Sequence, residues 1–549
     1  MIKQLFSYSL PAPTELHWWQ YGVIYQVYPR SFMDGNNDGV GDLAGIIQRL
    51  DYLAQLGVKC LWISPVYPSP MYDFGYDVSD YTDIDPIFGT LTEWDTLLEH
   101  AHAKGMKLIM DLVPNHTSHL HPWFVESRQT GDNPKRDWYI WRDPGVNAGV
   151  PNNWISFFGG SAWEFDELTG QYYLHQFVKQ QPELNYRNPD VLDAMLKIMR
   201  FWLDKGVDGF RVDVIWLLIK DAAFKDEPLN KNWNGDNPHA RLKHTHTANQ
   251  PEVHVVISAF RTQLDEYPDR VMMGEIDLPF SELMDYYGQQ QNECHIPTNF
   301  SLIHTHWTAY DVGQVIHQYL DLLPEGAWPN WVLGNHDQRR LASRLGLVQA
   351  KVATVLLLTL PGTPVWYYGD ELGMDNGLIA KHQIKDPQAV NQPEHAEQWG
   401  RDPERTPMQW DATANAGFSA NGVKPWLPVS SDYQEKNVSV QRVQKNSFLN
   451  LFQQLMALRI NEPAFTQGTF DLLPSGNTDV LAYIRSCGQR KFLVVLNFSQ
   501  CMQRYQYNGF AETGRLVLST TIRQDDLINQ VNWILHPDEG CIIKLETQE

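Results

Sequence analysis

Apolar residues recur along this chain in two alternating patterns, one typical of buried strands and the other of amphipathic helices. Short, nearly continuous apolar runs predict strands at residues 21–31, 58–66, 107–113 and 209–213. Between the first three strands, Leu and Ile at helical spacing predict helices over residues 43–57 and 91–105. This order of strand and helix implies a parallel sheet with right-handed crossovers.

The same alternation continues along the rest of the first 460 residues. Further strands are predicted at 271–275, 296–303, 331–334 and 363–368, and further helices at 189–205, 252–267, 340–358 and 447–460. Eight strands in this order predict an α/β fold, the (β/α)8 TIM barrel, in which the C-terminal ends of the strands meet at one face.

Two stretches depart from the alternation. Residues 117–186 are rich in Trp, Asn, Gly and Pro and are too long for a loop, so we expect an inserted domain after strand 3. After residue 466 only short strands follow, at 480–485, 491–498, 515–519 and 531–535. We therefore expect a barrel of residues 1–116 and 187–465, an inserted domain at 117–186 and an all-β C-terminal domain, a β-sandwich, at 466–549.

Composition narrows the class of partner. The 549 residues carry a formal net charge of -22, which disfavours binding to nucleic acid or to a membrane surface and suits a small neutral substrate. The five cysteines form no CxxC pair, so neither a disulfide framework nor a zinc site is expected. No apolar run reaches 18 residues and the N-terminus lacks a convincing signal peptide, so we expect a cytoplasmic monomer or small homo-oligomer.

Three carboxylates stand at or just past the ends of predicted barrel strands: Asp213, Glu275 and Asp337. Such a group suits either a metal ion or acid/base and nucleophilic work on a glycosidic bond. Each carboxylate comes from a different strand, and Arg211 and His336 lie beside two of them. This pattern favours glycosidic chemistry over a metal centre.

Several motifs occur in an ordered series between residues 75 and 410. They are DLVPNH at 111–116, GFRVDV at 209–214, GE at 274–275, GNHD at 334–337, QPELN at 181–185, GYDVSDY at 75–81, YGDELGM at 368–374 and RDPERTPMQW at 401–410. The series resembles the α-amylase clan, glycoside hydrolase family 13, in its oligo-1,6-glucosidase and α-glucosidase branch. Glu183 is a departure, because that branch usually carries Asp in the QPDLN motif.

The resemblance implies a role for each matching residue. Asp213 corresponds to the nucleophile, Glu275 to the general acid/base and Asp337 to the third carboxylate, which holds sugar hydroxyls. The substrate-binding residues implied are Tyr76, Asp77, His116, Arg211, His336 and Arg401, with Arg405 as a nearby alternative to Arg401. Among these, Asp77 and Arg401 are expected to pair around the non-reducing-end hydroxyl, and Arg211 is expected to lower the pKa of the nucleophile.

A loop after the first strand has the alternating oxygen ligands of a cation site. The candidate ligands are the side chains of Asp34, Asn36, Asp38 and Asp42 and the carbonyl of Val40. Such a set suits Ca²⁺ or Mg²⁺ in a structural role, and related branch members carry a metal here. The alternative is a Gly/Asn-rich turn whose carboxylates are solvated. No organic cofactor is expected.

These observations predict a retaining, exo-acting α-glucosidase that removes terminal α-linked glucose from short oligosaccharides. Val214 follows the nucleophile and resembles the α-1,6-cleaving members, although a β-branched residue there also suits core packing. Two alternatives remain open. One is a transglycosylase or isomerase of the same branch, such as a sucrose isomerase, a trehalose synthase or a sucrose hydrolase. The other is a non-catalytic carbohydrate-binding or transporter-associated barrel.

Overall fold

The computed structural model describes residues 6–10, 16–474, 476–506, 513–523, 527–528 and 532–546. Its centre is a barrel of eight parallel strands, as predicted. They are β2 (Ile24–Val27), β3 (Cys60–Ile63), β4 (Lys107–Leu112), β8 (Gly209–Val212), β9 (Val271–Glu275), β10 (Ile296–Thr298), β11 (Asn330–Val332) and β12 (Thr363–Tyr367). The ladder runs β10-β9-β8-β4-β3-β2-β12-β11.

Side chains complete the ring between the two ends of this ladder, β10 and β11. The fully buried Asn330 donates from Nδ2 to the carbonyl of Pro297 on β10. In return, Asn299 donates from Nδ2 to the carbonyl of Asn330 at 2.9 Å. These amide groups satisfy backbone carbonyls at the seam, where an unmet buried polar group would be costly.

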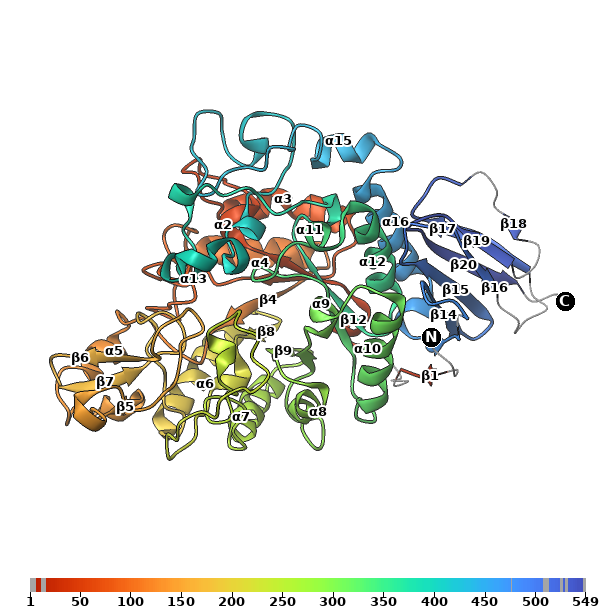
Figure 1. Cartoon of the computed structure of the whole chain (residues 1–549). Coiled ribbons are helices and arrows are strands. Elements are labelled where there is room, and N and C mark those ends of the chain that lie inside the picture. Colours follow the sequence, from red (N-terminus) through yellow and green to blue (C-terminus); the bar gives the residue numbers. More distant parts are fainter. Residues whose placement is uncertain are drawn as a thin grey trace.

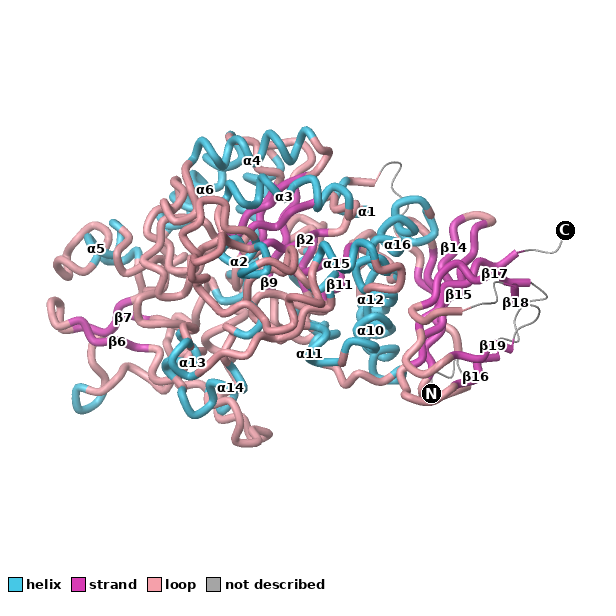
Figure 2. The backbone as a smooth tube through the Cα atoms, turned by 90° about the horizontal axis from the view of Figure 1, so that it is seen from above, coloured by secondary structure: helices cyan, strands magenta, loops and turns pink. Residues whose placement is uncertain are grey.

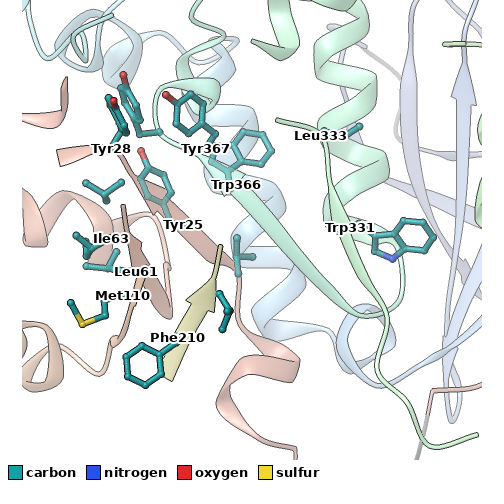
Figure 3. Close-up of a cluster of buried hydrophobic side chains, with 14 of the residues drawn as sticks. Tyr25, Tyr28, Leu61, Ile63, Met110, Phe210, Trp331, Leu333, Trp366 and Tyr367 are labelled. Atoms are coloured by element: carbon teal, nitrogen blue, oxygen red, sulfur yellow. The ribbon is translucent and has the colours of Figure 1, made fainter. Parts of the chain in front are cut away.

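The two faces of the barrel sheet bury different side chains, as strand alternation requires. Ile24, Trp62 and Val365 belong to an inner cluster drawn from every barrel strand except β8. Their chain neighbours Leu61 and Trp366 face outward and pack with the helices (Figure 3). Polar residues take inward positions near the C-terminal ends of several strands, so their functional groups reach the mouth of the barrel.

Several of the helices around the barrel begin at side-chain caps. Thr90 accepts the Glu93 N–H at the start of α4 (Leu91–Ala103), and Asp42 does the same for Gly45 in α3 (Leu43–Gln55). The other long helices are α6 (Pro189–Asp204), α7 (Val253–Asp265), α10 (Ala309–Leu322), α12 (Leu347–Thr359) and α16 (Phe448–Asn461). None of the helices that the structure describes has the length and apolar character needed to cross a bilayer.

Three predicted elements differ from the structure, each for a local reason. The first strand is shorter than expected, because Pro29 opens the short helix α2 (Pro29–Phe32). The predicted sixth strand ends at Thr298 and is followed by the helix α9 (Ser301–His304). The helix predicted over 340–358 is divided by Gly346, whose φ of 77° separates α11 (Leu341–Leu345) from α12.

The inserted segment folds into a small antiparallel sheet at one end of the molecule (Figure 1). It contains α5 (Pro122–Ser127), β5 (Trp141–Arg142), β6 (Trp163–Asp166) and β7 (Gln171–Leu174), with the strand order β5-β7-β6. These elements lie within the predicted range 117–186. The segment also meets the long loop after β8, since Trp154 donates from Nε1 to the carbonyl of Lys225 at 2.9 Å.

The C-terminal strands form one seven-stranded antiparallel sheet at the opposite end (Figures 1 and 2). Its order is β1 (Phe6–Tyr8), β13 (Thr469–Leu472), β14 (Val480–Cys487), β15 (Arg490–Asn497), β20 (Gly540–Glu546), β17 (Thr513–Ser519) and β18 (Leu527–Ile528). A separate pair, β16 (Gln503–Gln506) and β19 (Asn532–Leu535), packs on one face, and α10 and α12 approach the other. Val531, the first residue of the predicted strand 531–535, lies outside the described residues.

This arrangement corrects one prediction. Residues 6–8 belong to the C-terminal sheet and not to the barrel, because β1 pairs with β13 from Phe6 opposite Leu472 to Tyr8 opposite Phe470. The β16–β19 pair covers one face of the large sheet across a shared apolar cluster, so two layers of strands pack together, and helices cover the other face of the large sheet. A three-residue edge strand with no strong periodicity carries too little pattern to be detected in the sequence.

Candidate active site

The predicted catalytic residues line one cavity of about 600 Å³ at the C-terminal ends of the barrel strands. The predicted residues that line it are Tyr76, His116, Asp213, Glu275, Asp337 and Arg401. Arg211 and His336 are buried next to them and bind them directly. Asp77 does not reach this cavity, as described below. The barrel thus brings together groups that lie more than 300 residues apart in the chain.

One guanidinium joins the two carboxylates that were assigned to bond cleavage. Arg211, buried on β8, donates from Nη1 to Asp213 Oδ1 at 2.7 Å. Its Nη2 lies 2.6 Å from Glu275 Oε2. Nη1 also donates at 2.7 Å to Asp111 Oδ1. Asp111 lies on β4 directly opposite Arg211 on the neighbouring strand β8. Both predicted catalytic carboxylates are therefore held by a single planar group.

The carboxylates of Asp213 and Asp111 are buried around the Arg211 guanidinium. Burial raises the pKa of Asp213 well above its ordinary value; Arg211 opposes this effect, while Glu275 and Asp111 add to it. Burial likewise raises the pKa of Asp111 to about 6. The predicted effect of Arg211, which lowers the pKa of Asp213, is present, but the net pKa is raised because desolvation and two neighbouring negative charges outweigh one shared positive charge.

Val214 has a strained backbone and lies between the two predicted catalytic carboxylates. Its φ and ψ are 36° and 43°, a left-handed conformation that is rare for a β-branched residue. This turn directs the Val214 N–H to Glu275 Oε2 at 3.0 Å. The strain is thus coupled to a hydrogen bond that orients the predicted acid/base.

A neutral imidazole supports the third carboxylate. His336 stacks on Tyr76 with ring centres 5.3 Å apart, and its Nε2 lies 2.7 Å from the Tyr76 hydroxyl and 3.2 Å from Asp337 Oδ2. Burial lowers the pKa of His336 well below its ordinary range, so the ring carries no charge at neutral pH. Burial alone would raise the pKa of Asp337, but the positive charges of Arg401 and Arg405 contribute to lowering it, and Asp337 stays ionised.

The predicted pairing of Asp77 with Arg401 is wrong. Asp77 is fully buried and accepts hydrogen bonds from Ser69 Oγ and from the backbone N–H groups of residues 72 and 73. Arg401 instead pairs with Asp73, at 2.7 Å, and with Asp337, at 3.0 Å. Asp73 lines the cavity, so it takes the place that the sequence analysis gave to Asp77.

Aromatic side chains form much of the remaining wall. Phe157, Phe158, Phe177, Trp216, Phe300 and Trp399 line the cavity. The Arg401 guanidinium lies 4.7 Å from the centre of the Phe158 ring, and His116 packs against Phe177. Such rings suit the C–H faces of sugars. His116 is neutral as well, because burial lowers its pKa to about 3.

Two carboxylates of the predicted cation loop accept hydrogen bonds mainly from backbone N–H groups of the loop itself. Asp34 accepts N–H groups from residues 37, 38 and 39, and Asp42 accepts from residues 35, 36 and 45. Within the described part of the chain, no three His, Cys, Asp or Glu side chains are arranged to hold a metal ion. The oxygen donors of Asp34, Asn36, Asp38, Val40 and Asp42 still suit a hard cation chemically, so the Ca²⁺ or Mg²⁺ site stays a prediction.

Comparison with known proteins identifies the family. A family model described as the catalytic domain of α-amylase matches residues 26–468. The chain belongs to the α-amylase family of glycoside hydrolases. Within this family, maltase 1 of Drosophila virilis is 40% identical over 97% of this chain and 88% of its own length. An oligo-1,6-glucosidase of Parageobacillus thermoglucosidasius is 40% identical over 88% of this chain and 91% of its own.

Other relatives of the chain are proteins with different functions. An amino acid transporter heavy chain of Homo sapiens is 39% identical over 98% of this chain and 79% of its own length. A solved isomaltulose synthase of Erwinia rhapontici, bound to sucrose, superposes with a TM-score of 0.89 at 35% identity, covering 97% of this chain and all of that one. The family is therefore shown, whereas the reaction within it has to be argued from the site.

Several site residues were missed by the sequence analysis. Asp111 heads the first motif, and strand alternation could have placed it inside the barrel beside Arg211. Asp73 could not have been distinguished from Asp77, because both are acidic and flank the same Phe-Gly-Tyr stretch. Only the fold shows which of the two faces the cavity.

Proposed function

We propose that this α-amylase family member is a retaining, exo-acting α-glucosidase that releases terminal α-glucose from short oligosaccharides. The observation that carries the proposal is the cross-linked wall around Arg401, which joins Asp73 and Asp337. Such a wall would stop a chain from passing beyond the glucose that is cleaved. The enzyme would then act at non-reducing ends and leave internal bonds of starch intact.

The mechanism follows from the placement of the carboxylates. Asp213 attacks the anomeric carbon, and Glu275 protonates the departing glycosidic oxygen. This division of roles needs an ionised Asp213, and the Arg211 guanidinium, which donates to Asp213 Oδ1, favours that ionised form. Glu275 then removes a proton from the water that releases glucose, so the α-configuration is kept. Asp337, held ionised by Arg401 and Arg405, would bind hydroxyls of the distorted ring.

The main alternative is a transglycosylase or isomerase of the same branch. It is favoured by the likeness to isomaltulose synthase, and it needs the same three carboxylates. The two reactions differ in whether water or a second sugar reaches the glycosyl-enzyme. The cavity extends past the catalytic pair to Asn237, Ile303 and Trp399, which leaves room for a second sugar in either reaction.

A non-catalytic, transporter-associated barrel is the alternative from another class. The heavy-chain relative makes this reading worth testing. The carboxylates, the shared guanidinium and the neutral His336 form a complete reaction centre, and a purely binding protein would have no need of them. An α-glucosidase therefore accounts for more of the site.

The test is a proton NMR time course with isomaltose, maltose and sucrose in separate tubes. Early α-glucose from isomaltose or maltose, lost in Asp213→Asn, is the expected result. Faster release from isomaltose would support the α-1,6 preference that Val214 suggests. Early β-glucose would contradict retention, and isomeric disaccharides from sucrose would favour the isomerase. Sugar binding with no product from any tube would favour the non-catalytic barrel.

We also propose that the loop at 34–42 binds Ca²⁺ or Mg²⁺. Asp34, Asn36, Asp38, Asp42 and the Val40 carbonyl would supply oxygens to a cation with a structural role. The proposal is supported by the all-oxygen donor set and by the position of Asp42, which caps α3 and so links the loop to the first barrel helix.

A further inference from the structure

Asp386, a buried carboxylate outside the predicted site, binds Arg401, which lines the cavity. Asp386 is fully buried at the start of α13 (Pro387–Asn391). Its Oδ1 accepts from Arg401 Nε at 2.8 Å and lies 2.8 Å from Arg401 Nη2. Its Oδ2 accepts the backbone N–H of Arg401 at 3.2 Å. One carboxylate therefore holds both the main chain and the side chain of Arg401.

The remaining edge of the same guanidinium points to two residues that line the cavity. Nη1 donates to Asp337 Oδ1 at 3.0 Å, and Nη2 donates to Asp73 Oδ1 at 2.7 Å. A guanidinium is a planar fork with fixed donor directions. Once its Nε edge is bound to Asp386, the directions of the other N–H groups are set. Phe158 covers the guanidinium at 4.7 Å and limits its tilt.

We propose that Asp386 is a positioning residue for the glucose-binding end of the cavity. It orients Arg401, and Arg401 holds Asp73 and Asp337 where they meet hydroxyls of the glucose being cleaved. This inference rests on the proposed α-glucosidase function. Asp386 itself does not line the cavity, so it acts through Arg401 and not on the sugar.

Asp386 also has a structural role at the start of α13, and the test must distinguish this role from the positioning of Arg401. Its Oδ2 caps α13 by accepting the N–H of Ala389, and its own N–H is bound by Asp402. Asp386→Asn keeps the size and an acceptor for the cap but removes the charge that binds Arg401. Asp402→Asn is the matched control, because Asp402 anchors the backbone of residues 385 and 386 without a hydrogen bond or ion pair to the guanidinium.

The experiment measures kcat and KM on the disaccharide that the wild-type enzyme cleaves best. We expect Asp386→Asn to lower kcat/KM by about 10- to 100-fold, mainly through KM, since a charged hydrogen bond to bound sugar is misplaced. Asp402→Asn should lower it by less than about 3-fold. In an Arg401→Lys background, Asp386→Asn should change kcat/KM by less than about 3-fold, because the group it orients is already gone.

Binding of 1-deoxynojirimycin, a glucose-shaped amine, provides a readout that does not need turnover. Calorimetry should show at least about 10-fold weaker binding to Asp386→Asn than to the wild type. The positioning role would be refuted if Asp386→Asn and Asp402→Asn weakened inhibitor binding equally, or if Asp386→Asn lowered kcat/KM by the same factor with and without Arg401. Asp386 would then only stabilise the fold of its loop. An inactive wild type whose binding still depends on Asp386 would remove the glucosidase proposal and leave the positioning role in place.

Discussion

Replacing Lys220 by Met should destabilise the protein strongly through a buried ion pair. Lys220 and Glu183 are 1% and 0% exposed, and the Lys220 ammonium pairs with the Glu183 carboxylate. The same ammonium donates to Asn115 Oδ1 at 2.9 Å and to the Leu217 carbonyl at 2.5 Å. The Met side chain matches Lys in length but leaves Glu183 buried without a counter-charge.

The expected loss is about 3–5 kcal/mol of unfolding free energy at neutral pH, the usual cost of breaking a buried pair at one end. Burial already raises the pKa of Glu183, and Lys220 opposes that shift. Without Lys220 the pKa of Glu183 rises further above its unfolded value of about 4.3. The folded variant then binds a proton that the unfolded chain releases, so its deficit should be smaller at pH 5 than at pH 8.

The assay is pulse proteolysis across a urea gradient after unfolding and refolding series have reached the same folded fraction, so that the urea midpoint reports an equilibrium free energy. The double variant Lys220→Met/Glu183→Gln is the control, because it removes both charges at similar volume. It should recover at least about 2 kcal/mol of the single-variant loss. A Lys220→Met loss below about 1 kcal/mol, or a double variant as unstable as the sum of the two singles, would refute the argument.

Three further predictions concern other parts of the molecule. Burial would raise the pKa of Glu539, but hydrogen bonds from Arg523, Ser519 and Thr521 lower it to about 2. Glu539 should therefore stabilise the C-terminal sheet above pH ~4.3 and lose that contribution as the pH falls towards 2. Glu539→Gln should thus cost about 2–3 kcal/mol at pH 7, with a gap to wild type in denaturation midpoints that narrows below pH 4; a constant gap would contradict the shift. Asp73→Asn should lower kcat/KM by about 100-fold, whereas Asp77→Asn should mainly lower the melting temperature, and steady-state kinetics with thermal melts would expose the reverse order. Removing cations with EDTA should lower the melting temperature by several degrees in wild type but by less in Asp38→Asn, and identical melting curves with and without EDTA would argue against the cation site.

Much of the architecture was contained in local sequence patterns. The helical and strand spacings and the order of eight strands were enough to predict the barrel, since periodicity depends on neighbours a few residues away. The same order placed Asp213, Glu275 and Asp337 at strand ends, and the ordered motifs indicated the family. Each spacing pattern and each motif lies within about ten consecutive residues, so it can be recognised in the sequence alone.

Other features required the tertiary structure because they depend on which distant groups share one low-dielectric site. The choice of Asp73 over Asp77 as the partner of Arg401 crosses 328 positions of the chain, and no local pattern distinguishes the two acids. The net pKa shift of Asp213 follows from the burial and neighbouring charges that only packing defines. The pairing of β1 with β13 likewise joins the first residues of the chain to its C-terminal sheet. Sequence spacing determined which residues could reach the barrel mouth, and three-dimensional packing decided their partners and their charges.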